Sequence, residues 1–280
     1  MSTVLYTRDD LLRLAQGFSG TPRILAQLTQ LIRDQSMGLA DAAELLKRDP
    51  AVAARIIRIA NSVAMSQSEP VSSVEAASQL IGLREIHRIV GIMAIDHFGA
   101  EGLPAYGLSK KQVRENCILV ALLMEEFAKS ADEDPPTAYA IGLLRPLGLL
   151  ALDQLIVESG SPERFDQAVH ADLGVWEQNT FGSTSPQATA DILEAWHFPG
   201  EIPRAIRDHR TPEGLHLPYI HLLHITARMA DRLGYGLLCE SSYWTDSDEL
   251  WRKAGLDPKN TQLQAQRAFI AFDRLCRAMG

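Results

Sequence analysis

The sequence predicts an all-α protein. Apolar residues recur at the helical spacing of three and four through nearly the whole chain, and no convincing segment alternates apolar with polar residues as a half-buried strand does. Capping residues and prolines precede many of the apolar runs, and glycines follow several of them. We expect roughly ten to thirteen helices.

The first clear helix follows Asp49, whose side chain can cap a helix that begins with Pro50. The segment AVAARIIRIANS continues it, and we expect Asn61 to close it because asparagine tolerates the left-handed conformation of a helix end. Arg55 and Arg58 interrupt its apolar pattern, either as a solvated stripe or as a surface for a partner.

Capping boxes predict the starts of the next helices. Ser72 is followed three residues later by Glu75, and these two residues can form a capping box at the start of a helix. Gly82 can end that helix. The sequence SKKQ at 109–112 repeats this device ahead of a long apolar run. The glycine-rich stretch FGAEGLPAYGLS lies just before it, so we place a subdomain boundary near residue 105.

Prolines open the later helices. Ser161 and Ser185 each precede a proline, and Pro218 begins another apolar run, so we expect a helix at each of these three points. The last expected helix is QLQAQRAFIAFDRLCRAM, near the end of the chain.

Composition limits the function. The 280 residues carry a formal net charge of -8, and an acidic chain is poorly suited to follow a phosphate backbone, so we expect no nucleic-acid partner. The N-terminus lacks the pattern of a signal peptide, and no segment approaches about 20 unbroken apolar residues, so we expect no membrane partner. Three scattered cysteines fit a reducing compartment. We expect a cytoplasmic protein.

Three blocks of the sequence resemble the HDOD family, which consists of bacterial all-helical domains related to the HD-type metal phosphohydrolases. The blocks are LLKRDPAVAARIIRIANS at 45–62, VSSVEAASQLIGLREIHRIV at 71–90 and ILEAWHFPGEIPRAIRDHRTP at 192–212. With the helices between them, the resemblance covers residues 5–235.

The resemblance implies a helical bundle of two packed subdomains. We expect an N-terminal helical subdomain over residues 1–105 and a degenerate HD-like subdomain over residues 106–240. The remaining residues, 241–280, would form a C-terminal helical extension.

HD phosphohydrolases hold divalent metal with histidines and carboxylates, and metal activates the attacking water. In the resemblance, the His-Asp dyad falls on Arg145 and Pro146, because GLLRPLG matches the family's Gly-Leu-Leu-His-Asp-Ile-Gly. Arginine stays protonated and has no free lone pair for a metal, and proline has no donor atom in its side chain. Proline also disfavours helical geometry in the residue before it, so a helix should end at Arg145.

The other ligand positions of the family are also replaced. The resemblance places the early histidine near Asn116 and a further histidine near Ser185. The late acidic position falls near Arg228, or on Asp231 if the alignment shifts by a few residues. These replacements imply a pocket without metal, in which Arg145 faces Asn116 and Ser185.

Three arginines are candidates for the same pocket, and they are Arg145, Arg210 and Arg228. Guanidinium groups there would either bind an anion such as a nucleotide phosphate or pair internally with carboxylates. The carboxylates that we consider are Asp153, Asp191 and Asp231.

Histidines offer a rival site. His221 and His224 are spaced to share one helix face and, with His209 or His216, could bind metal. The alternative is that they are buried helix residues bonded to backbone or carboxylate.

We therefore expect a non-catalytic bacterial signalling or regulatory protein that needs no cofactor and acts by contact with another signalling protein. One alternative is a metal-independent sensor of a phosphate-bearing nucleotide. The other is a metal-dependent phosphohydrolase with displaced ligands.

Overall fold

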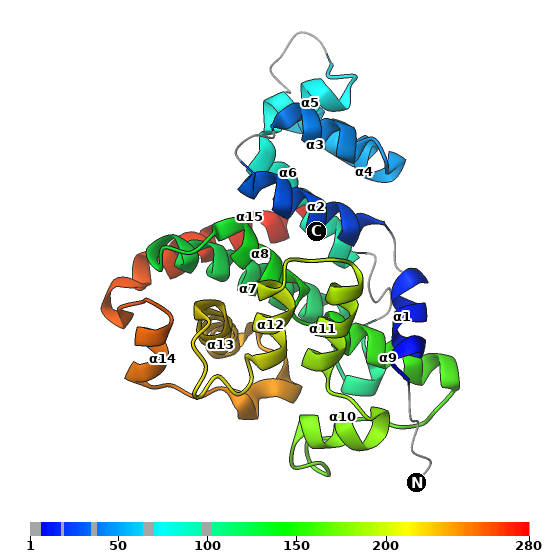
Figure 1. The fold of residues 1–280 in the computed structure, drawn as a ribbon, viewed down its shortest axis with the longest axis vertical. Coiled ribbons are helices and arrows are strands. Elements are labelled where there is room, and N and C mark those ends of the chain that lie inside the picture. Colours follow the sequence, from blue (N-terminus) through cyan, green and yellow to red (C-terminus); the bar gives the residue numbers. More distant parts are fainter. Residues whose placement is uncertain (1–6, 18–19, 35–37, 64–69, 97–101, 280) are drawn as a thin grey trace. The chain divides into compact units, whose positions relative to one another are not determined.

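The structure is a computed structural model that describes residues 7–17, 20–34, 38–63, 70–96 and 102–279. These residues form fifteen α-helices with short 3-10 and π segments, and they contain no β-strand (Figure 1). The all-α prediction is confirmed. The helices outnumber the expected ten to thirteen because the apolar pattern does not resolve elements as short as α14 (Asp248–Lys253).

The chain divides into two compact units. The smaller unit covers residues 19–97, and the larger unit covers residues 1–18 together with 98–280. The helices of the smaller unit are α2 (Thr21–Arg33), α3 (Leu39–Leu46), α4 (Pro50–Val63), α5 (Val74–Ile81) and α6 (Leu83–Asp96).

The larger unit holds the remaining helices. They are α1 (Arg8–Gly17), α7 (Lys110–Ser130), α8 (Pro135–Leu144), α9 (Leu147–Ser159), α10 (Leu173–Phe181), α11 (Ser185–Ala195), α12 (Glu201–Asp208), α13 (Pro218–Ala230), α14 and α15 (Gln262–Met279). Its short segments are η1 (Pro104–Tyr106), η2 (Asp231–Tyr235), η3 (Leu238–Tyr243) and η4 (Pro258–Asn260).

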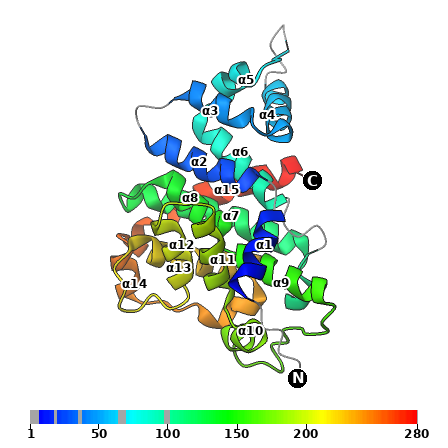
Figure 2. The ribbon, with the colours of Figure 1, turned by 45° about the vertical axis from the view of Figure 1, so that its right-hand side comes forward.

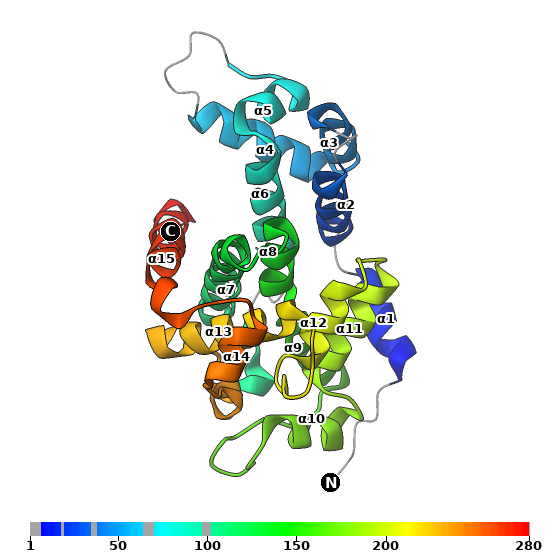
Figure 3. The ribbon, with the colours of Figure 1, turned by 60° about the vertical axis from the view of Figure 1, so that its left-hand side comes forward.

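The units differ from the expected boundaries at both ends of the chain. Helix α1 packs on α9 and α11 (Figure 2) and buries Leu11 and Leu14 there, so it joins the larger unit rather than a subdomain over residues 1–105. Helix α15 packs along α7 (Figure 3) through the buried Phe272, so residues 241–280 are part of the same core. The pattern of an amphipathic helix shows which of its faces is buried, but it does not show which other helices that face packs against.

Two local expectations in the smaller unit are wrong. Helix α4 does not close at Asn61 but runs on to Val63. The Asn61 side chain instead bonds both backbone groups of Val71, accepting from its N–H at 2.7 Å and donating to its carbonyl at 2.9 Å. The next helix is capped by Ser73 rather than Ser72. Asn61 therefore anchors the chain that leads into α5.

Most of the expected helix starts in the larger unit are confirmed. Ser109 and Gln112 form the predicted capping box of α7. Helices α11 and α13 begin at Ser185 and Pro218. No helix opens at Ser161, because residues 161–172 are irregular.

The irregular segment is fixed by a long-range contact. The N–H of Phe165 donates to the carbonyl of Ala105 at 2.7 Å, so this backbone bonds outside its own segment. A long-range hydrogen bond of this kind competes with local helix formation, and the local sequence pattern does not predict it.

The stretch that contains helices α8 and α9 is strongly apolar. The stretch Pro135–Ser159 contains a window with a mean hydropathy of 1.6, which by length and composition alone would suffice to cross a membrane. In the structure, 89% of that window is buried inside the protein. Its apolarity is that of a core element.

Two glycines bring neighbouring helices close to the end of α8. A Cβ on Gly142 would lie 2.7 Å from the Cα of Ala121, so only glycine lets α8 approach α7 this closely. A Cβ on Gly148 would lie 1.9 Å from the carbonyl oxygen of Ser185, so α9 meets α11 in the same way. The junction of α8 and α9 is therefore enclosed by α7 and α11.

Candidate functional site

The site begins at the break between α8 and α9. Helix α8 ends at Leu144, and Arg145 and Pro146 form the turn before α9. Thr189 of α11 stabilises this turn, because its hydroxyl donates to the carbonyl of Arg145 at 3.2 Å and accepts from the N–H of Gly148 at 2.8 Å. The predicted end of a helix at Arg145 is confirmed, and two backbone groups at the ends of α8 and α9 bond to Thr189.

The Arg145 side chain lies in the interior, where only 1% of it is exposed. One terminal nitrogen donates to the Glu240 carboxylate, and the other donates to Oδ1 of Asn116. Asn116 in turn donates from its amide to the carbonyl of Tyr235 at 2.7 Å. The indole of Trp244 lies 5.9 Å from the guanidinium carbon, within cation–π range.

Arg210, just beyond α12, enters the same pocket. One nitrogen donates to Glu240 at 2.8 Å and to the Ser185 hydroxyl at 2.9 Å, and another donates to Glu177 at 3.3 Å. The ring of Tyr243 lies 4.8 Å from its guanidinium carbon. Two arginines from separate elements thus share the Glu240 carboxylate.

Glu177 of α10 completes the cluster. It accepts from the N–H of Ser185 at 2.9 Å and from the Tyr106 hydroxyl at 3.3 Å, in addition to Arg210. We call Arg145, Arg210, Glu177 and Glu240 the buried tetrad. Its two guanidinium groups balance its two carboxylates, so the buried charge is compensated inside the protein.

The two carboxylates have different electrostatic surroundings. Burial raises the pKa of Glu240, but the Arg145 and Arg210 guanidinium groups outweigh it and lower that pKa to about 2. Burial raises the pKa of Glu177, and Arg210 opposes this only in part. Burial lowers the pKa of Arg210, but Glu177 and Glu240 more than reverse this effect. Glu240 is therefore the more firmly ionised carboxylate of the tetrad.

The structure brings together most, but not all, of the residues singled out from the sequence. Asn116, Arg145, Ser185 and Arg210 converge, with Pro146 in the adjoining turn. The convergence expected of Arg228 is wrong, because this side chain pairs with Asp246 at 2.6 Å, and 45% of that carboxylate side chain is exposed.

Internal pairing was one of the two expected arrangements, but its carboxylates are not those we considered. Asp153 accepts from the N–H of Ala105 at 2.7 Å, and Asp191 lies 3.7 Å from Arg8. Neither Asp153 nor Asp191 nor Asp231 is the partner that Arg145 and Arg210 use.

Sequence reasoning missed Glu177 and Glu240. Each acid directly follows a short apolar run that ends in Trp176 or Cys239, and all four side chains are buried. An isolated acid at the end of such a run is a candidate for a buried ion pair, because an unpaired buried charge would be costly. That signal could have identified both residues without naming their partners.

The histidines bond to backbone groups. Nδ1 of His209 donates to the carbonyl of Ile206 at 2.6 Å, and Nδ1 of His224 donates to the carbonyl of His209 at 2.9 Å. Nε2 of His221 lies 3.1 Å from the carbonyl of Leu215. Burial lowers the pKa of His209 to about 3, so this ring is neutral.

The residues do not fit a divalent metal. Within the described ranges, no three or more His, Cys, Asp or Glu side chains are grouped so that they could hold an ion. The positions implied by the family resemblance carry Asn116, Arg145, Pro146 and Ser185, which do not form an anionic or imidazole donor set. No chemical step through a metal can be built on them.

Comparison with known proteins identifies the fold and the family. The chain is similar to a solved structure from Marinobacter aquaeolei VT8 named for a proposed role in signal transduction, at 21% identity and a TM-score of 0.73. That match covers 99% of this chain and 66% of the other, so this chain spans about two thirds of its length.

Two further solved structures share the fold. One is an HDOD domain protein of unknown function from Geobacter sulfurreducens, at 17% identity and a TM-score of 0.61, with coverages of 95% and 93%. The other, from Shewanella amazonensis SB2B, is named as a proposed phosphohydrolase, at 19% identity and a TM-score of 0.60, with coverages of 92% and 93%. No curated protein sequence matches the chain.

The profile of the HDOD domain matches residues 19–212, which is well over half of the chain. This match spans the smaller unit and most of the elements that carry the tetrad. The chain belongs to the HDOD domain family.

Proposed function

We propose that this HDOD protein is a non-catalytic regulatory protein that acts in the bacterial cytoplasm by contact with another signalling protein. The family resemblance supports a place in signalling, and the solved relative named for signal transduction is consistent with it. The contents of the pocket support the absence of catalysis.

The observation that carries the proposal is the buried tetrad. At the positions where the family resemblance puts the metal and phosphate of an HD enzyme, Arg145 and Arg210 pair with the carboxylates of Glu177 and Glu240. The guanidinium groups cannot ligate metal, and the carboxylates are already bonded. A pocket filled in this way has no open coordination site, which hydrolysis by a metal-bound water requires.

The nucleotide sensor is the weaker reading. Binding a phosphate at this position would require the two arginines to release Glu240, and the buried carboxylate would then need another partner. Titration calorimetry of the wild-type protein with guanine and adenine nucleotides tests it. Micromolar binding that a stably folded Arg145→Ala variant lacks would favour the sensor over the scaffold.

A hydrolysis assay tests the central part of the proposal. The purified full-length chain is incubated with phosphomonoesters, phosphodiesters and nucleotides in the presence of manganese, iron or zinc. We expect no turnover above that of the same mixture without protein. Metal-dependent turnover that persists through repeated purification and is lost in Arg145→Ala would contradict the proposal.

A further inference from the structure

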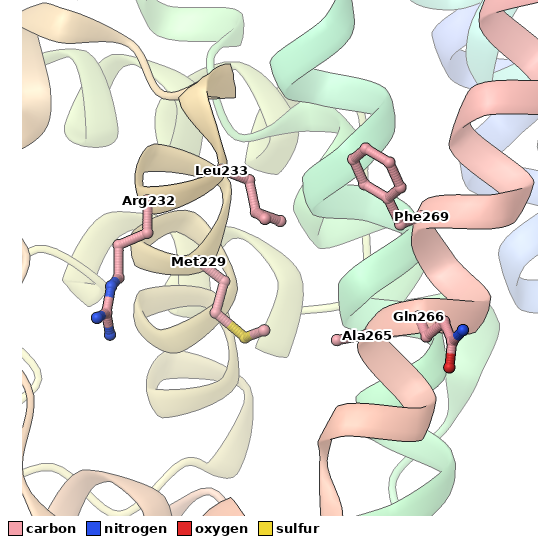
Figure 4. Close-up of a pocket in the computed structure, with 6 residues that line it drawn as sticks. All are labelled: Met229, Arg232, Leu233, Ala265, Gln266 and Phe269. Atoms are coloured by element: carbon pink, nitrogen blue, oxygen red, sulfur yellow. The ribbon is translucent and has the colours of Figure 1, made fainter.

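Helix α15 has three different faces. One face packs on α7 and carries the buried Ala268 and Phe272. A second face, with Ala265 and Phe269, lines a hollow of about 400 Å³ whose other wall is the end of α13 with η2 (Figure 4). The third face is exposed to solvent.

The exposed face carries Leu263, Arg267, Ile270 and Arg274. These residues lie four, three and four positions apart, so the 3.6-residue turn of an α-helix places them along one line. Leu263 is 56% exposed and Ile270 is 46% exposed, and both arginines are exposed as well. We call these four residues the α15 stripe.

The spacing of the α15 stripe is that of a seam between two helices. Side chains that repeat every three and four residues form the line along which one α-helix packs on another. Leu263 and Ile270 are seven residues apart, and an arginine follows each of them by four residues. A helix laid along this line covers both apolar side chains and the apolar stems of the arginines. The geometry therefore fits an amphipathic helix as the occupant.

The charges of the α15 stripe are all of one sign. It contains two arginines and no carboxylate, although the chain has a net charge of -8. Arg277, next along the same line, pairs with Asp273 at 2.8 Å, whereas Arg267 and Arg274 pair with no carboxylate of the described residues. Unpaired guanidinium groups beside exposed apolar residues complement a surface that combines carboxylates with apolar side chains.

We propose that the α15 stripe binds an acidic amphipathic helix of a partner protein. The apolar residues of that helix cover Leu263 and Ile270, and its carboxylates pair with Arg267 and Arg274. This inference rests on the proposed function, contact with another signalling protein, and names the chemistry of the partner.

Two other occupants fit the α15 stripe less well. In a dimer of this chain through α15, the arginines of one copy would face those of the other, which is repulsive. An anionic lipid surface is a plane and would face the whole acidic molecule, whereas a single helix contacts only the stripe.

A displayed library of helical peptides, selected on the full-length chain, tests the proposal. The peptides carry Leu or Ile at heptad spacing, and the positions beside these residues are randomised between Glu and Lys. We expect glutamate-rich peptides to be enriched and their binding to weaken as salt is raised. Ile270→Gln should weaken that binding by at least about tenfold, whereas Val157→Gln, the same kind of change at another exposed apolar residue, should not alter it.

A charge exchange makes the test specific to the α15 stripe. The double variant Arg267→Glu with Arg274→Glu should weaken the binding of glutamate-rich peptides and strengthen that of matched lysine-rich peptides. Arg232→Glu is the control, because this exposed arginine lines the hollow rather than the stripe, and it should change neither affinity. Thermal unfolding of each variant checks that the fold is retained.

Several outcomes would overturn the inference. They are enrichment of lysine-rich peptides, enrichment of none, and binding that ignores Ile270→Gln. Binding that Arg232→Glu abolishes and the stripe variants leave intact would assign the peptides to the hollow instead. A dimer in sedimentation, or binding to phosphatidylserine vesicles, that Ile270→Gln abolishes would assign the stripe to a second copy or to lipid. The hydrolysis assay is independent of all these outcomes, so failure of the stripe and failure of the proposed function remain distinguishable.

Discussion

Arg145→Ala removes the guanidinium group that joins the end of α8 to Glu240 and Asn116. The side chains of this ion pair are only 1% and 3% exposed, so the carboxylate that loses its partner cannot be solvated by water. Breaking a buried pair from one side typically costs about 3–5 kcal/mol. Because Arg210 still bonds Glu240 at 2.8 Å, we expect a loss near the lower end, about 3 kcal/mol.

Arg228→Ala is the matched control. It makes the same substitution in an ion pair whose carboxylate, Asp246, has 45% of its side chain exposed, so we expect a cost of about 0–1 kcal/mol. Urea unfolding of the wild type and both variants at pH 7 measures the two values, with unchanged m-values required for the comparison. Equal costs for the two variants would refute the claim that Arg145 lies in a buried, internally paired pocket.

Three further predictions concern other features. The neighbouring arginines lower the pKa of Glu240 to about 2 from its ordinary value of 4.5, so its charge stabilises the fold above pH 4.5, and this contribution is lost as pH falls toward 2. The stability difference between wild type and Glu240→Gln should therefore shrink in acid, and a constant difference would contradict it. Gly148→Ala should cost about 1–3 kcal/mol in thermal unfolding, whereas Gly200→Ala, which meets no atom within 4 Å, should cost far less. Asn61→Ala should cost about 1–2 kcal/mol by removing both side-chain bonds to Val71, and an unchanged unfolding midpoint would refute this.

Local pattern was sufficient for the fold class and for most helix starts. The capping box at Ser109 and the helix that begins at Pro218 follow from residues within one turn of each other, so the sequence contains the whole signal. The expectation at Ser161 failed because the nearby Phe165 bonds the distant Ala105. The expectation that Asn61 closes its helix failed for a similar reason, because its side-chain amide bonds to the backbone of Val71.

Only part of the candidate site could be predicted from the sequence. The position of Arg145 at a helix end followed from Pro146 and from the resemblance, and its neighbour Asn116 followed from the same alignment. The role of Glu240 could not be predicted, because this residue lies 95 residues from Arg145 in a segment beyond the family match. Charge balance required a carboxylate in the pocket, but only the tertiary fold decides which one reaches it.

The hollow between the end of α13 with η2 and α15 could not be predicted from the sequence. Its two walls come from η2 with the end of α13 and from α15, and nothing in the sequence pattern says that both helices pack on α7. The sequence shows Leu233 and Phe269 as ordinary members of amphipathic helices. Only the folded chain shows that they face a common hollow (Figure 4).

Elemental analysis of the purified full-length protein tests the central claim most directly, because a pocket filled by its own arginines and glutamates leaves no ligands for metal. The account predicts no stoichiometric iron, manganese or zinc after mild purification, and no uptake when these ions are added and excess is removed. About one or two equivalents of any of these metals, retained by the wild type and lost in Glu240→Gln, would contradict it.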